Sequence, residues 1–194
     1  TQPHGRGLSY FDLVFAHYRA FRRAGVSVDI VPADSADLSG YRIVAAPGLM
    51  QLPDALPPAV QASGPLALYG PRTGARGPGF DIPLPLPPAL ADCNVTVTRV
   101  ESLRPDMPEP LDGGGAISGY REHLETSDTP VLMANGDPVA VRSGTTLYNG
   151  AWLDDAGLDR LEGLHCNEAQ VTTRALPHGV RIRETGSETF WFNH

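Results

Sequence analysis

The sequence has no lysine and only two cysteines, and these absences exclude several kinds of chemistry. All fifteen basic residues among the 194 are arginine. Schiff-base catalysis, lysine general bases and a Walker-type phosphate lysine are therefore excluded. Cys93 and Cys166 form no C-x-x-C pair, which indicates neither a disulfide framework nor a zinc site. We expect a reducing, cytoplasmic setting.

Charge of either sign is also scarce, at 19% of residues with a net charge of −7. No block of arginine offsets the acidic excess, so we expect no binding to nucleic acid or to a membrane surface. No apolar run approaches the roughly 20 residues that span a bilayer. The chain starts without methionine or a charged-then-apolar leader, so we expect no targeting segment and a sequence excised from a longer protein.

The first half of the chain alternates between helix and strand patterns, which is typical of an α/β fold. A helix is predicted from Ser9 to Ala24, with its aromatic stripe in the core and His17 on the exposed side. The stripe consists of Phe11, Val14, Phe15, Tyr18 and Phe21. Strands are predicted at residues 26–31, 42–47 and 65–70, and a short helix at 53–63.

The second half favours β-hairpins. A strand is predicted at residues 93–100, and tight turns at Asn135-Gly136 and Ser143-Gly144 predict three short strands. Asp154-Asp155 is expected to cap a helix over 154–164. A final hairpin is expected around Gly186.

The loop from Tyr69 to Gly79 contains Arg72 and Arg76 among glycines, so it could bind an anion, although a structural or interface role is the favoured interpretation. His165, Cys166 and Glu168 cluster in sequence, but adjacent side chains seldom face each other as a nucleophile and base must. The Asn167-Glu168 pair of many glycosidases needs a barrel strand end, whereas here it is expected in a linker.

No metal or cofactor site is predicted, because the histidines lack the H-x-x-x-H and H-E-x-x-H spacings that place two ligands on one helix face. The histidines considered are His4, His17, His123, His178 and His194.

Three stretches together resemble the middle, trimerisation domain of family 42 β-galactosidases. They read "LSYFDLVFAHYRAFRRAGVSVDIV", "DLSGYRIVAAPGL" and "GPRTG", and the resemblance covers roughly residues 2–152. The closing "PHGVRIRETGSETFWFNH" is similar to the start of that family's small C-terminal β-domain.

The resemblance implies a flavodoxin-like domain at residues 1–164, lacking the family's first strand, and a partial β-domain at 165–194. In such enzymes both catalytic glutamates belong to a (β/α)8 barrel, which nothing in this chain matches. It therefore implies no catalytic residue here. The implied role is assembly of a homotrimer beside the catalytic barrel of the same parent chain, in an enzyme that hydrolyses terminal non-reducing β-D-galactose residues.

The domain also resembles the class I glutamine amidotransferase-like fold, whose enzymes carry a cysteine at the turn after the third strand. Here that turn reads "LYGPRTG" and has no thiol. Two alternatives stay open: a degenerate amidotransferase-like hydrolase that uses Cys166 or Cys93, and a carbohydrate-binding module in which exposed Trp152 or Trp191 stacks on a sugar.

Overall fold

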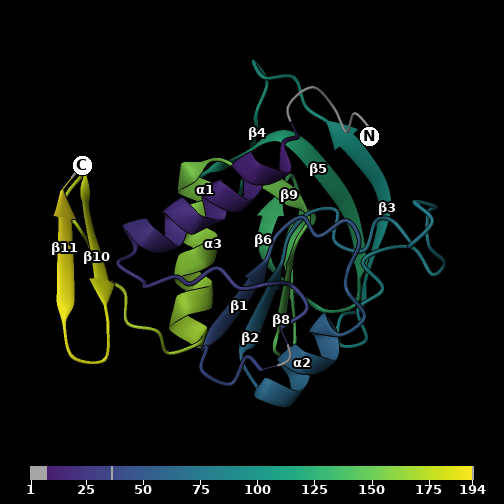
Figure 1. The fold of residues 1–194 in the computed structure, drawn as a ribbon. Helices are drawn as coiled ribbons and strands as arrows, with labels where there is room; N and C mark the ends of the chain where they lie inside the picture. The colour runs from purple at the N-terminus through teal and green to yellow at the C-terminus, as the bar shows by residue number, and fades with distance from the viewer. Residues whose placement is uncertain (1–7, 36, 194) are drawn as a thin grey trace.

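The centre of the molecule is a five-stranded sheet (Figure 1) in a computed structural model that describes residues 8–35 and 37–193. Its strand order is β1-β2-β8-β7-β6. β1 (Ile43–Ala46), β2 (Leu66–Tyr69) and β8 (Thr146–Asn149) are parallel, and β7 (Asp137–Ser143) and β6 (Thr129–Ala134) continue the sheet in antiparallel pairs. The α/β prediction is confirmed at this level.

Different elements cover the two faces of this sheet. Helices α1 (Tyr10–Arg23) and α3 (Asp155–Glu168) lie on one face, where Phe21 and Leu161 belong to the same core cluster as Leu68. The other face is covered by α2 (Leu56–Ser63) and a second sheet formed by β3 (Val95–Ser102), β4 (Glu109–Pro110), β5 (Ala116–Thr126) and β9 (Ala151–Leu153). Leu68 faces one core and its neighbour Tyr69 the other, as alternation along a buried parallel strand requires.

Most of the predicted elements are present. The two predicted hairpins are confirmed, because β6 and β7 are joined at Asn135-Gly136, and β7 and β8 at Ser143-Gly144. Asn135 and Gly136 have φ of 52° and 84°, the left-handed pair that a tight hairpin turn needs. The final hairpin is also confirmed, as β10 (Val180–Glu184) and β11 (Thr189–Asn193).

The strand predicted at residues 26–31 is wrong. This segment has no strand hydrogen bonds, and side chains hold it instead. Ser27 Oγ accepts from the amide of Glu184 at 3.0 Å, and Arg183 donates to the carbonyl of Val28 at 3.2 Å and to Asp29 at 2.8 Å. A β-strand needs a hydrogen-bonding neighbour, and no described strand lies in position to supply the ladder.

Asp154 caps α3 as the sequence predicts, and its side chain also ties the helix to β5. Its carboxylate accepts from the amides of Gly157 at 2.8 Å and Ala116 at 3.0 Å. We expect Asp154→Ala to lower the free energy of unfolding by about 1–2 kcal/mol, because two amides lose their acceptor. Urea unfolding at constant m-value measures this loss. Asp154→Asn, which keeps a capping oxygen, should lose less; an equal loss would contradict the capping role.

None of the helices in the described part of the chain has the length and apolarity that crossing a bilayer requires.

Candidate functional site

The loop after β2, where the sequence placed two arginines, is packed into the protein. Pro71, Arg72 and Thr73 are buried, and Arg72 has φ of 71°, which residues other than glycine seldom adopt. The amides of Gly74 and Arg76 donate to the carbonyls of Leu49 and Met50, both at 2.9 Å. These two amides are therefore already engaged and do not form an anion cradle.

A buried carboxylate lies directly behind this loop. Glu122 on β5 accepts from the Arg72 amide at 2.9 Å, from the Tyr120 hydroxyl at 3.0 Å and from the Tyr148 hydroxyl at 2.7 Å. Burial raises the pKa of Glu122 to about 7, against the opposing effect of these hydrogen bonds. Burial likewise raises the pKa of Tyr148 well above its ordinary value. The cluster connects the two sheets but contains no activated nucleophile.

The two cysteines are unsuited to nucleophilic attack. Both are buried, and burial raises the pKa of Cys93 to about 11 and that of Cys166 to about 12. Because the thiolate is the attacking form, a thiol with such a pKa is inert at neutral pH. The geometry therefore disfavours the hydrolase alternative.

The sequence cluster around Cys166 lies on α3, which extends to Glu168, so the linker expected for Asn167 and Glu168 is wrong. Arg142 bridges the two residues that face the sheet: it donates to His165 Nδ1 at 3.0 Å and pairs with Glu168 at 2.5 Å. Burial, reinforced by the Arg142 charge, lowers the pKa of His165 to about 3, so the ring is neutral. The cluster is a structural contact between α3 and β7.

The outer face of α1 is an exposed aromatic surface. Phe11 is 80% exposed and Phe15 is 56% exposed, while His17 is only 2% exposed. The prediction that the aromatic stripe is buried with His17 outside is therefore wrong, except at Phe21. The helix has a second stripe, which shares Phe21 with the first and is otherwise made of smaller side chains. This second stripe faces the core: Leu13, Ala16, His17, Ala20 and Phe21.

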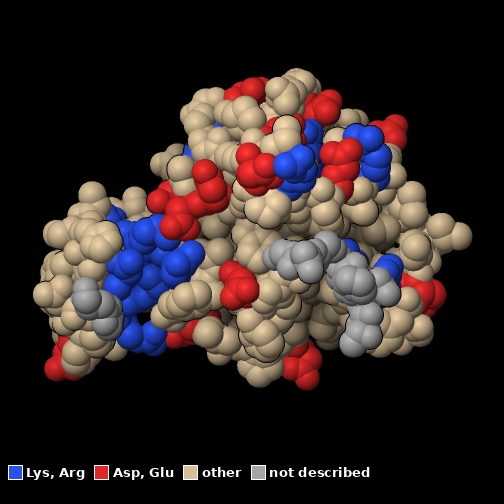
Figure 2. Space-filling model, turned by 90° about the horizontal axis from the view of Figure 1, so that it is seen from above, with Lys and Arg blue, Asp and Glu red and all other residues tan. Residues whose placement is uncertain are grey.

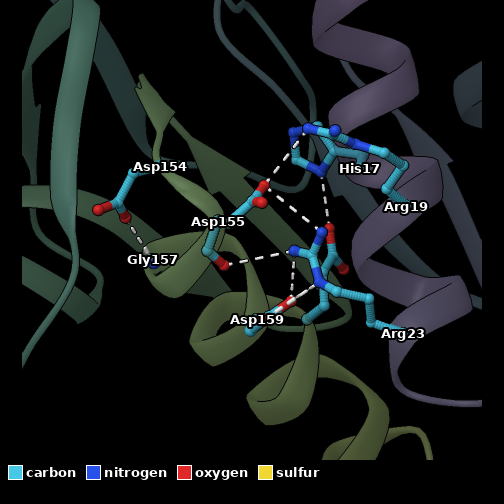
Figure 3. A network of polar contacts seen from close by, with 8 residues as sticks. His17, Arg19, Arg23, Asp154, Asp155, Gly157 and Asp159 are labelled. Atoms are coloured by element: carbon cyan, nitrogen blue, oxygen red, sulfur yellow. Dashed lines mark hydrogen bonds and ion pairs between the residues drawn. The ribbon is translucent and has the colours of Figure 1, made fainter. Parts of the chain in front are cut away.

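Polar contacts with α3 fix α1 in this orientation (Figure 3). His17 Nδ1 lies 2.6 Å from Glu162 Oε1 inside the protein. Outside, Arg23 bonds Asp159 at 2.6 Å, and both Arg19 and Arg23 reach Asp155 at 3.4 Å. Exposed ion pairs contribute little individually, so the buried pair is the stronger determinant of which face turns inward.

Two shallow grooves flank the aromatic residues. One, of about 410 Å³, lies between Phe11, Val14, Phe15, Tyr18 and Ile30; we call it the α1 groove. The other, of about 340 Å³, begins on the far side of Phe15, and Arg19 and the half-buried Trp152 line it. Aromatic residues and arginine are enriched at protein interfaces, and both kinds of residue line these grooves.

Charged side chains form a different region of the surface. Arginines gather on the side of the C-terminal hairpin, with acidic residues beside them (Figure 2). Arg183 pairs with Asp29 at 2.8 Å and Arg174 with Glu184 at 2.7 Å. On the hairpin, Trp191 is 63% exposed. These ion pairs balance part of the positive charge, so the region is mixed in sign.

The sequence interpretation missed the buried Glu122 cluster. The available signal was the alternation in "YRE", which puts Tyr120 and Glu122 on the same face of a strand. Of the histidines, His123 contacts Glu101 at 3.2 Å and His178 lies in the exposed connection before β10, while His4 and His194 are outside the described residues. Within the described ranges, no three potential metal ligands gather.

Comparison with known proteins gives consistent relatives. A family model described as the β-galactosidase trimerisation domain matches residues 1–172. A β-galactosidase of Thermus thermophilus is 36% identical over 201 residues, which cover 100% of this chain and 31% of that protein. A β-galactosidase of Halorubrum lacusprofundi is 32% identical, over 100% of this chain and 32% of that protein. The chain spans about a third of the length of these curated relatives.

Solved structures agree. The crystal structure of β-galactosidase from the psychrophilic Marinomonas ef1 superposes with a TM-score of 0.93 at 30% identity, covering 99% of this chain and 30% of that one. The polyextremophilic β-galactosidase from the Antarctic haloarchaeon Halorubrum lacusprofundi gives a TM-score of 0.89 at 29% identity, covering 99% of this chain and 31% of that one.

Proposed function

Because the chain belongs to the family of β-galactosidase trimerisation domains, we propose that it joins three copies of one protein into a homotrimeric β-galactosidase. The intact protein hydrolyses terminal non-reducing β-D-galactose residues in β-D-galactosides, in the cytoplasm. This chain supplies contact surface and no catalytic residue. Its other partner is the catalytic barrel of the same parent chain.

The observation that carries this proposal is the exposed aromatic face of α1. A contiguous apolar surface on a soluble domain marks an interaction site. Here the exposed Phe11 and Phe15 are held outward by the His17–Glu162 contact on the opposite side of the helix. Burying such aromatic side chains between subunits supplies association energy.

We also propose that the domain is flavodoxin-like and that one strand belongs beside β1. The parallel order of β1, β2 and β8, with helices on both faces, supports this fold. β1 is an edge strand among the described residues, so its outer side is open to a further strand. The division into domains at 1–164 and 165–194 stays a prediction; α3 continues through this boundary to Glu168.

Sedimentation velocity of the intact protein tests the assembly role. We expect the wild type to sediment as a trimer and the double variant Phe11→Ser/Phe15→Ser as a monomer. An aromatic residue at the centre of an interface contributes about 2 kcal/mol or more, so each lost side chain weakens association by about 30-fold.

Met107→Ser is the matched control, because it removes an exposed apolar side chain that lines neither groove. It should leave the trimer intact. A monomeric wild type would overturn the proposed function, and a variant trimer as stable as the wild type would remove α1 from the interface.

A further inference from the structure

We propose that residues 80–86, here called the proline arm, dock in the α1 groove of the next copy. This inference rests on the proposed function. A closed ring of three identical chains uses a heterologous interface, in which one patch of each chain contacts a different patch of its neighbour. The α1 groove is one apolar patch, so a trimer needs a second patch of complementary shape and chemistry.

The proline arm has the properties of that second patch. Phe80, Ile82 and Leu84 are exposed, with Leu84 at 86%, and Leu86 is partly so. Pro83 and Pro85 separate the aliphatic side chains. Proline restricts the backbone and has no N–H, so the arm loses little conformational entropy on binding and buries few unpaired donors.

The α1 groove suits such a segment. Its walls are the side chains of Phe11, Phe15 and Tyr18 with Val14 and Ile30, around a volume of about 410 Å³. Proline-rich segments characteristically bind in aromatic-lined grooves. Two charged residues border the groove: Asp12 is part of its lining, and the Arg19 guanidinium carbon lies over the Phe15 ring, 5.4 Å from the ring centre. The arm has a single charged residue, Asp81, which we place toward Arg19.

The arm of one chain cannot fill its own groove. It is anchored beside β3, where the amide of Val97 donates to the carbonyl of Pro87 at 2.9 Å and Pro88 bridges Thr96. Leu90, just beyond it, belongs to the core on the side of the central sheet opposite α1. In Figure 1, α1 in purple and the chain leading into β3 lie on different sides of the molecule. The contact must therefore form between copies.

Disulfide trapping in the intact protein tests the pairing. We expect the double variant Phe15→Cys/Leu84→Cys, oxidised with copper phenanthroline, to give inter-chain bands up to a covalent trimer on a non-reducing gel. Each single variant should give none, because a heterologous contact does not bring like positions together. Cys93 and Cys166 are buried, so they do not compete. Phe15→Cys/Val100→Cys, with its second thiol on the exposed β3 site, should remain uncross-linked.

A second measurement separates this inference from the proposed function. Leu84→Arg should convert the trimer to monomer in sedimentation velocity. This variant keeps an intact groove, and Phe15→Arg keeps an intact arm. A mixture of the two should therefore form one interface per pair and sediment as a dimer. If the wild type is a trimer but Leu84→Arg remains trimeric and the double-cysteine variant does not cross-link, the arm does not dock in the groove, while the assembly role stands. A monomeric wild type would instead overturn both.

Discussion

His17→Ala is expected to lower the free energy of unfolding by about 3–5 kcal/mol, because it leaves the buried Glu162 carboxyl without its partner. The other carboxyl oxygen of Glu162 has no hydrogen-bonding partner within the described residues, so nothing nearby compensates for the loss. Burial raises the pKa of Glu162. The unpaired side chain must therefore either take up a proton or draw α3 away from α1. Urea unfolding of the wild type and variant measures the difference.

Two variants serve as controls for this result. Glu162→Gln keeps an oxygen that can bond to His17 and should lose less stability than His17→Ala. The double variant His17→Leu/Glu162→Leu replaces both polar groups with apolar ones and should recover most of the loss. If His17→Ala costs under about 1 kcal/mol, the contact does not hold α1 in place.

The second large effect is a loss of stability with rising pH that depends on Glu122. Its folded-state pKa of about 7 lies above the ordinary value of 4.5, so between these values the folded protein holds a proton that the unfolded chain has released. The unfolded state then binds fewer protons, and the free energy of unfolding must fall as pH rises. This contribution is fully present below pH 4.5 and decreases by about 3 kcal/mol by pH 7.

Glu122→Gln isolates this effect, because the amide is nearly the same size but does not titrate. We expect the wild-type stability to decline relative to Glu122→Gln between pH 4.5 and 7 and to run parallel to it above that range. Asp37 and Asp128, whose pKa values are lowered by hydrogen bonds, titrate below this range in both proteins. The contrary result would be two stability curves that run parallel at every pH. Glu122 would then have the same pKa in the folded and unfolded states, because its hydrogen bonds offset the free-energy cost of burying the charge.

The sequence predicted those elements whose formation depends on residues close together in the chain. Asn135-Gly136 fixes a turn whatever surrounds it, and Asp154 caps α3 with its own side chain. The segment 26–31 has an equally good strand pattern, but no strand of the described residues pairs with it. A strand pattern describes a side-chain preference, whereas the strand itself depends on its partner.

The orientation of α1 could not be predicted, because the helix has two apolar stripes. The stripe of larger aromatic residues has the stronger pattern, but the stripe of smaller residues faces α3. His17 on this second stripe is buried because it pairs with Glu162, which lies 145 residues away in the sequence. The same applies to Glu122, whose bonds join β5 to the loop after β2 and to β8. Both features depend on contacts between distant segments, which no local window contains.

The long sequence separation of these contacts also bears on how the chain is made. Within this chain α1 is translated before its partners on α3, which lie 132 to 145 residues later. The helix must therefore leave the ribosome with both of its apolar stripes unprotected, and it can dock only after α3 has been synthesised. Nascent chains of this protein are consequently exposed to premature self-association, and chaperone binding to the early helix would serve to delay it.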